Sequence, residues 1–168
     1  MKLEDAKRIS IVGNSGAGKS TLSDILGKHL KKNVFTIDKI YWMPDWELRD
    51  RQSYKTLHDE LLIQESWIID GVGYWEELEQ RLLISDMVIF LDVPISVCKE
   101  HALNRIEQEK WSRNPHITED CLYGEVKEKQ LEVIENFQSF LRPKIIALLE
   151  KVGQEKVKVI EKAAELVI

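Results

Sequence analysis

Apolar residues in this chain fall into two kinds of segment that follow one another in turn. Short apolar runs indicate β-strands, whereas longer segments with apolar residues three or four positions apart indicate amphipathic helices. The runs predict five strands, at residues 8–12, 34–37, 67–69, 87–91 and 156–160. The spacing predicts helices at residues 52–64, 76–83 and 94–109, from about residue 122, and in the tail after the fifth strand.

A further helix is predicted after Lys19, where the helical spacing is clearest. One face of this helix is formed by Leu22, Ile25, Leu26, His29 and Leu30. The alternation of strands and helices favours an α/β fold, with a parallel sheet that carries helices on both faces.

Two segments interrupt the pattern. Residues 38–50 are rich in aromatic residues and are predicted to be irregular. Residues 110–120, KWSRNPHITED, are polar and have no periodicity, which is typical of a mobile lid. Pro143 should bend or restart the last long helix near Arg142, because proline cannot donate a helical hydrogen bond.

The composition is that of an ordinary globular protein, with 43% hydrophobic and 32% charged residues. A chain of 168 residues is short for two cores, so we expect one domain over residues 1–168, with the lid at about 110–120. The net charge of −5 provides no general attraction for nucleic acid. The longest apolar run, residues 87–91, is too short to cross a membrane, and the N-terminus is too charged for a secretory signal. We therefore expect a cytoplasmic protein.

The cysteines and histidines do not show the spacing of a disulfide framework or a zinc site. We expect Cys98 on a helix face and Cys121 near a helix start, both as reduced thiols. No structural metal site is predicted from these residues.

Residues 13–20, GNSGAGKS, match the phosphate-binding pattern G-x-x-x-x-G-K-[ST] between a predicted strand and a predicted helix. Its glycines let backbone N–H groups turn inward around phosphate oxygens. Lys19 is placed to neutralise the β- and γ-phosphates of ATP, and Ser20 to bind Mg²⁺. The predicted nucleotide-binding residues are Gly13, Asn14, Ser15, Gly16, Ala17, Gly18, Lys19, Ser20 and Thr21.

A second ligand for Mg²⁺ should be an acidic residue at the end of an apolar strand. Asp70 follows the apolar residues WII, and Asp92 follows VIFL. The apolar context favours Asp92, but Gly71 allows the chain to turn directly after Asp70, so Asp70 is preferred. The alternative for either residue is a carboxylate that caps the next turn.

Five stretches of the sequence resemble the small P-loop proteins labelled DNA topology modulation proteins, which are similar to adenylate kinases. They are GNSGAGKSTLSDILG, TIDKIYWMPDW, WIIDG, RLLISDMVIFLDVP and NFQSFLRPKI. The resemblance covers nearly the whole chain. It implies a nucleoside monophosphate kinase-type sheet of five parallel strands in the order 2-3-1-4-5, with a lid after the fourth strand. It also implies that Asp70 lies beside the strand that leads into the phosphate loop.

The sequence departs from this family at two arginine positions, which are occupied here by Ile95 and His101. The loop after Asp70 is also one residue longer. The resemblance leaves Arg81, Arg105 and Arg113 in place. Because phosphoryl transfer needs cations around the moving group, the missing arginines weaken the case for fast chemistry.

The acceptor of the phosphoryl group should bind opposite the loop, against the aromatic segment. Asp38 could bind a hydroxyl group or a base edge, while Tyr41, Trp42 and Trp46 could stack on a ring. Alternatively, these aromatic residues could pack in the core or under the lid. Arg81 could hold an acceptor phosphate or form a surface ion pair.

Arg105 and Arg113 bracket the proposed lid, whose closure could bring a guanidinium group to the transition state. A solvated loop arginine is the alternative for Arg113. His101 is mostly neutral at pH 7 if its pKa is unperturbed, so it substitutes poorly for an arginine and is interpreted as structural.

The leading hypothesis is a phosphotransferase that passes the γ-phosphate of MgATP to a small acceptor such as a nucleotide or nucleoside. A nucleotide-dependent regulatory protein of the topology modulation type and a slow NTPase are the alternatives. Direct binding of nucleic acid is not expected, because no helix-turn-helix, zinc finger or long basic run is present. The choice between ATP and GTP and the oligomeric state stay open.

Overall fold

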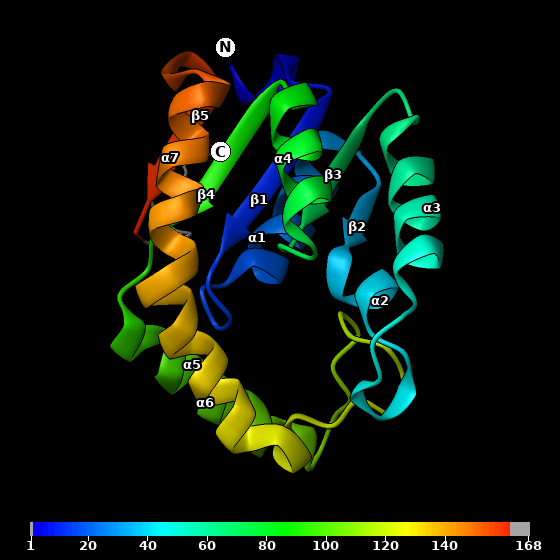
Figure 1. The fold of residues 1–168 in the computed structure, drawn as a ribbon, viewed down its shortest axis with the longest axis vertical. Helices are drawn as coiled ribbons and strands as arrows, with labels where there is room; N and C mark the ends of the chain where they lie inside the picture. Colours follow the sequence, from blue (N-terminus) through cyan, green and yellow to red (C-terminus); the bar gives the residue numbers. More distant parts are fainter. Residues whose placement is uncertain (1, 162–168) are drawn as a thin grey trace.

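Residues 2–161 are described by the structure, a computed structural model. Five strands form one sheet in which all neighbouring strands run parallel. They are β1 (Arg8–Gly13), β2 (Val34–Thr36), β3 (Trp67–Asp70), β4 (Met87–Leu91) and β5 (Val157–Ile160). The strand order β2-β3-β1-β4-β5 confirms the α/β fold that the sequence predicts (Figure 1).

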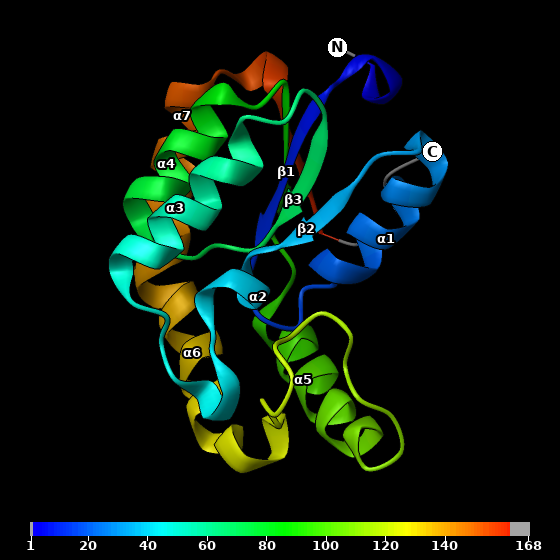
Figure 2. The ribbon, with the colours of Figure 1, turned by 90° about the vertical axis from the view of Figure 1, so that its right-hand side faces the viewer.

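Helices cover both faces of the sheet. Figure 2 shows α3, α4 and α7 on one face and α1 on the other, with α5 and α6 extending beyond the carboxyl ends of the strands. The helices are α1 (Lys19–Leu30), α2 (Ile37–Tyr41), α3 (Arg51–Leu62), α4 (Trp75–Ile84), α5 (Ile95–Glu109), α6 (Lys127–Asn136) and α7 (Arg142–Val152). In the described part of the chain, no helix has both the length and the apolar character that a bilayer span requires.

The two faces of the sheet bury separate apolar clusters, because successive side chains of a strand point to opposite sides. Ile11 packs with Leu22 of α1 on one face, whereas Val12 packs with Leu78 of α4 on the other. Every residue of β3 and β4 is buried, as expected for strands covered on both sides. Each fully buried aliphatic or aromatic side chain contributes roughly 1.5–3 kcal/mol, so these two layers fix the sheet and the loops at its edge.

The predicted buried face of α1 is partly wrong. Ile25 is 45% exposed, and His29 is also exposed. Two small residues, Ser23 and Gly27, face the interior in their place. A Cβ on Gly27 would come within 2.4 Å of Val34 Cγ2, so the small residues allow α1 to approach β2 closely. A pattern that counts only apolar residues misses this contribution.

The aromatic segment is more regular than predicted. The second strand ends at Thr36, one residue earlier than expected, and α2 begins at Ile37. A 3₁₀ turn then covers Pro44–Trp46, where Trp46 has a φ of 59°. A helix of five residues is too short to show a helical period, which explains why the sequence pattern did not reveal it.

The last long helix divides near Arg142, as predicted from Pro143. After α6, residues Phe137–Leu141 form a π-helical turn, and α7 begins at Arg142 with Pro143 in its first turn. Proline is tolerated there because the first N–H groups of a helix have no intrahelical partner. The helix predicted in the tail after the fifth strand lies outside the described residues.

Candidate active site

The phosphate loop joins the carboxyl end of β1 to the amino end of α1. Gly16 and Gly18 have φ values of 78° and 90°, in the left-handed region that favours glycine. A Cβ on Gly16 would lie 2.2 Å from the backbone oxygen of Cys98, on α5. The loop therefore needs glycine at this position for both its conformation and its close contact with α5.

Buried hydrogen bonds tie the start of this loop to α6. The Nδ2 atom of Asn14 donates to the backbone oxygen of Ile134 at 2.9 Å, and its Oδ1 accepts from the backbone N–H of Ser15 at 2.7 Å. Lys19 Nζ donates to the backbone oxygen of Asn14 at 2.8 Å. The side chain of Asn14 is thus committed to holding the loop rather than a ligand.

A cleft of about 1260 Å³ opens over the loop, which is room for a nucleotide and a small second molecule. All of the predicted residues 13–21 line it. So do five of the other predicted site residues, together with Tyr41: Asp38, Trp42, Trp46, Arg105 and Arg113. Two predicted site residues, Asp70 and Arg81, do not line the cleft.

The two ends of the cleft differ in their construction. The phosphate end consists of residues 13–21 and the amino end of α1. We call the lining around Asp38, where the sequence predicts the acceptor, the acceptor end; it includes Asp38, Tyr41, Trp42, Gly71–Gly73, Val133 and Phe137. Its two walls are close together, because Val72 packs against the apolar cluster that contains Phe137. The acceptor end thus brings together side chains from α2, α6 and the loop after β3.

A compact set of charges lies where the two ends meet. Burial lowers the pKa of Lys19, although the nearby carboxylates of Asp38 and Asp70 oppose this shift. Burial likewise raises the pKa of Asp38, against the attraction of Lys19. Lys19 and Asp38 are therefore close enough to interact although they come from different elements. The strand-edge geometry thus brings two cations, Lys19 and Arg105, and two carboxylates, Asp38 and Asp70, within electrostatic reach of one another.

Asp70 lies at the end of β3, paired in register with Ile11 of β1. This position beside the loop strand is the one that the family resemblance implies. Its Oδ2 accepts hydrogen bonds from Ser23 at 2.6 Å and Thr36 at 3.4 Å, and burial raises its pKa. Ser23 lies one turn after Ser20, which lines the cleft. The hydrogen bond to Ser23 thus places Asp70 one turn of α1 away from Ser20, the other predicted ligand of Mg²⁺.

The oxygen donors of Ser20 and Asp70 have the chemistry that Mg²⁺ prefers. Among residues 2–161, no three side chains of His, Cys, Asp or Glu gather into a metal-binding group. A magnesium ion at this position would therefore take its remaining ligands from phosphate oxygens and water, as Mg²⁺ commonly does. The other strand-end carboxylate, Asp92, accepts two hydrogen bonds of 2.6 Å from Arg142 and is part of the scaffold.

The position of Arg81 fits neither interpretation made from the sequence. These were a ligand for an acceptor phosphate and a partner in a surface ion pair. The side chain of Arg81 is completely buried under the loop after β3, where Nη2 donates to the backbone oxygen of Gly71. Burial lowers its pKa to about 10. The sequence placed Arg81 on a helix near the site, but could not show that its side chain points into the core.

Arg105 and Arg113 both line the cleft but are held differently. The guanidinium of Arg105 lies 3.6 Å from the ring centroid of Tyr123 and donates to Ser15 Oγ at 3.3 Å and Gln130 Oε1 at 3.1 Å. Arg113 is 68% exposed and forms ion pairs within the lid segment. Arg105 is thus fixed at the phosphate loop, whereas Arg113 lies at the surface of the segment of residues 110–120.

Three further residues contact the loop or its arginine. His101 Nδ1 lies 2.8 Å from the backbone oxygen of Gly16, which agrees with the structural role predicted for it. The sequence analysis passed over the other two: Gln130 connects the loop to α6, and Tyr123 supports Arg105. Gln130 lies four residues before the buried Ile134, on the same helix face, and this spacing is the signal that could have identified it.

The sheet order, the glycine loop at the end of β1 and the cleft at the carboxyl ends of the strands define a P-loop kinase fold. Two solved structures share it at low sequence identity. Shikimate kinase from Acinetobacter baumannii in complex with shikimate matches with a TM-score of 0.61 and 18% identity, over 98% of this chain and 90% of that chain. A gluconokinase from Sinorhizobium meliloti 1021 matches with a TM-score of 0.51 and 17% identity, over 95% and 86%.

Two curated proteins are similar in sequence. "Uncharacterized protein YqaC" of Bacillus subtilis (strain 168) is 33% identical over 105 residues, which are 59% of this chain and only 56% of that protein. "Probable thymidylate kinase 1" of Saccharolobus solfataricus is 27% identical over 171 residues, covering 80% of this chain and 87% of that protein. No known family model matches the chain, so the resemblance to topology modulation proteins stays a prediction.

Proposed function

We propose that this protein transfers the γ-phosphoryl group of MgATP to a hydroxyl group of a small acceptor bound in the cleft. The observation that carries the proposal is that Lys19 and Asp38 line one cleft and interact electrostatically. A cation for phosphate oxygens and a carboxylate for a hydroxyl proton are the two groups that such a transfer needs. The likeness to kinases with different acceptors supports the reaction class.

Asp38 orients the acceptor in this proposal. Its carboxylate accepts a hydrogen bond from the acceptor hydroxyl, which turns the hydroxyl oxygen toward the γ-phosphorus. As the new oxygen–phosphorus bond forms, the bond from the γ-phosphorus to the oxygen shared with the β-phosphate breaks. The hydroxyl proton passes to Asp38 and then to solvent.

The phosphate end stabilises the charge that moves during transfer. Backbone N–H groups of residues 13–21 and the amino end of α1 face the phosphates, and Lys19 neutralises the β- and γ-oxygens. Arg105 adds a second cation beside Ser15. Mg²⁺, held by Ser20 and Asp70, would neutralise phosphate charge when bound. Positioned charges of this kind supply most of the rate enhancement in phosphoryl transfer.

The segment of residues 110–120 connects the two sides of the cleft. His116 Nε2 lies 3.1 Å from Asp24 Oδ2 on α1, and Thr118 Oγ1 donates to the backbone oxygen of Trp42 at 2.7 Å. We propose that this segment is the mobile lid of a single domain covering residues 1–168. Its closure would exclude water and so favour transfer over hydrolysis.

The test is to incubate the protein with MgATP or MgGTP and a panel of hydroxyl-bearing small molecules, and to follow nucleotide and products by chromatography. We expect a new phosphorylated product with at least one acceptor. The product should disappear in Lys19→Ala and persist in Lys28→Ala, a matched change at an exposed position of α1. Excess chelator should also stop the reaction.

Other outcomes would redirect the proposal. Phosphate release that is equal with and without every acceptor would identify a slow NTPase. Nucleotide binding without turnover would favour a regulatory protein whose conformation responds to the nucleotide. A salt-dependent shift on DNA would favour the topology modulation type, which the net charge of −5 does not predict.

A further inference from the structure

The cations that line the cleft gather away from the acceptor end. Among the described lining residues, the lysines and arginines are Lys19, Arg105 and Arg113. Lys19 and Arg105 contact the phosphate loop directly. Arg113 is paired with Glu119 and Asp120 in the lid segment. Lys19 and Arg105 also act electrostatically on Asp38, but their hydrogen bonds hold both side chains at the phosphate loop.

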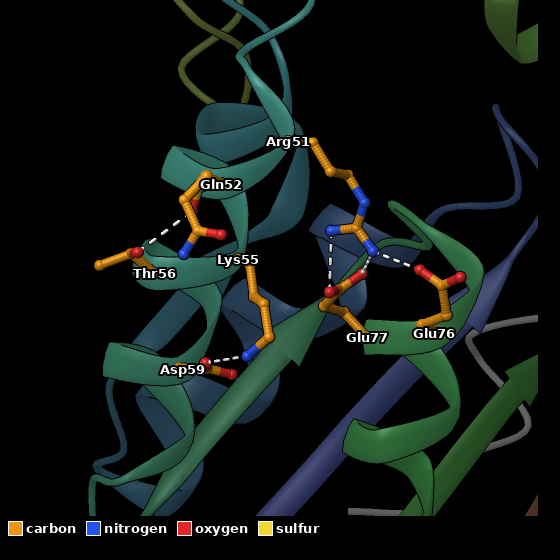
Figure 3. Close-up of polar contacts among 7 residues, drawn as sticks. All are labelled: Arg51, Gln52, Lys55, Thr56, Asp59, Glu76 and Glu77. Atoms are coloured by element: carbon orange, nitrogen blue, oxygen red, sulfur yellow. Dashed lines mark hydrogen bonds and ion pairs between the residues drawn. The ribbon is translucent and has the colours of Figure 1, made fainter.

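Arg51 directly follows the aromatic segment, but its charge is paired elsewhere. Its guanidinium forms ion pairs with Glu76 and with the buried Glu77 (Figure 3). It also lies 4.4 Å from the ring centroid of Tyr74. These two carboxylates raise its pKa. Arg51 does not line the cleft, and its charge is already neutralised by α4.

Two further arginines near this end are also committed to backbone groups. Arg49 Nε donates to the backbone oxygen of Ile40 at 2.8 Å, and Arg81 donates to Gly71 from a completely buried position. A Cβ on Gly73 would lie 2.1 Å from Tyr54 Oη, so the loop after β3 is closely packed over this interior. An acceptor in the cleft would meet the backbone of this loop and not the guanidinium of Arg81.

The acceptor end instead offers one carboxylate, aromatic rings and apolar side chains. Asp38 and Tyr41 come from α2, and Trp42 follows them; the ring of Trp42 meets that of Tyr41 edge-on, with centroids 5.0 Å apart. Phe137 and Val133 form the opposite wall. This combination suits a ring that carries a hydroxyl group, and these lining residues themselves include no cation for a phosphate or carboxylate of the acceptor.

We propose that the acceptor is an uncharged ring compound with a free hydroxyl group, such as a nucleoside or a cyclic sugar. This inference rests on the proposed phosphotransfer, and it assigns the class of substrate. An acceptor with its own phosphate or carboxylate would place a second negative charge beside Asp38, where the nearby cations Lys19 and Arg105 are already engaged at the phosphate loop. A mismatch of charge in a partly desolvated site discriminates strongly against the wrong ligand.

The test compares pairs in which one member carries an added anionic group on the same ring compound: thymidine with its 5′-monophosphate, adenosine with its 5′-monophosphate, and glucose with glucuronate. Transfer from MgATP gives kcat/KM for each, and tryptophan fluorescence with MgADP present gives binding. We expect the neutral member of the best pair to be preferred by at least about tenfold. The aromatic lining predicts that a nucleoside gives the best pair.

A variant that gains a positive charge tests whether the charge of the acceptor end causes the selectivity. Val133 is 52% exposed and lines the cleft, so Val133→Arg adds a cation at the acceptor end without disturbing the core. It should shift the selectivity at least about tenfold toward the anionic member of the pair. Ile63→Arg, at an 81% exposed position outside the cleft, is the matched control and should leave the selectivity unchanged. Asn136→Arg, at another exposed position of α6 that lines the cleft, serves as a second variant if Val133→Arg does not fold.

Each result decides the inference. Preference of the wild-type protein for the anionic members would overturn it and leave the phosphotransfer intact. Unchanged selectivity in a folded Val133→Arg or Asn136→Arg protein would overturn it too. If no pair member binds or reacts, the inference is wrong. In that case, MgATP binding that is lost in Lys19→Ala would show whether the nucleotide half of the proposed function still holds.

Discussion

The phosphate end and the acceptor end belong to one cleft, but one is lined mainly by backbone and the other by side chains. The phosphate end is one continuous stretch of backbone, residues 13–21, whose shape depends on glycines. The acceptor end is assembled from side chains of α2, α6 and the loop after β3, which are far apart in sequence. A site made of backbone recognises a group common to all nucleotides, whereas a site made of side chains can differ between related folds.

Among substitutions that act on only one end of the cleft, Asp38→Asn should have the largest effect. We expect kcat to fall about 10²–10³-fold, because the amide cannot accept the hydroxyl proton. MgATP binding should be retained, since the phosphate end is untouched. Asp45→Asn, at an exposed position of the same segment, is the control for the measurement of kcat and nucleotide affinity. Equal losses in the two variants would contradict the assigned role.

Gly16→Ala should damage the opposite end. The added Cβ would lie 2.2 Å from the Cys98 backbone oxygen, and the φ of 78° strains any L side chain. We expect MgATP affinity to fall at least about tenfold, in line with a strain of 1–3 kcal/mol. Gly124→Ala is the matched control, because its Cβ would meet only Ile106 Cγ2 at 3.8 Å. Calorimetric titration of both variants measures the difference, and similar affinities would refute the geometric argument.

Arg105→Lys tests the point where the two ends meet. Lysine keeps the charge but loses the planar contact with Tyr123 and the fork that reaches Ser15 and Gln130. We expect kcat/KM to fall about tenfold. Arg113→Lys should change it less than about threefold, because Arg113 is exposed on the lid. If Arg113→Lys proves the more harmful change, the cation that assists transfer belongs to the lid.

A smaller effect is expected from His58, which is buried behind the acceptor end, with its ring stacked 6.0 Å from that of Tyr54. Burial lowers its pKa to about 4. The unfolded chain binds this proton near pH 6.5, so the stability that neutral His58 contributes is lost as the pH falls from about 6.5 toward 4. The loss should reach roughly 3 kcal/mol.

The measurement is urea unfolding of wild-type protein and His58→Leu between pH 8 and pH 4. The variant should lose less stability than the wild type over this range, because leucine does not titrate. Phosphotransfer at pH 8 should be unchanged. Parallel stability curves for the two proteins would show that His58 does not titrate as expected.

The sequence predicted what depends on local pattern. The five strands, the loop at residues 13–20 and the restart of the helix at Pro143 all follow from neighbouring residues. The strand order came from the family resemblance and not from the pattern. What could not be predicted depends on side-chain direction: a helical position did not show whether Arg81 faces the core or the cleft. The five residues of α2 were too few for a period, and the role of Gln130 depends on a contact with Ser15 across 115 positions.

The segment of residues 118–122 is held to the aromatic segment largely through main-chain oxygens. Thr118 donates to the carbonyl of Trp42, and Cys121 Sγ to that of Met43. In return, Trp46 Nε1 donates to the carbonyl of Leu122 at 3.1 Å. Main-chain oxygens remain when side chains change, so substitutions of Trp42 and Met43 can alter the cleft wall and still keep these acceptors. The proposed choice of acceptor can therefore change separately from the proposed closure of residues 110–120.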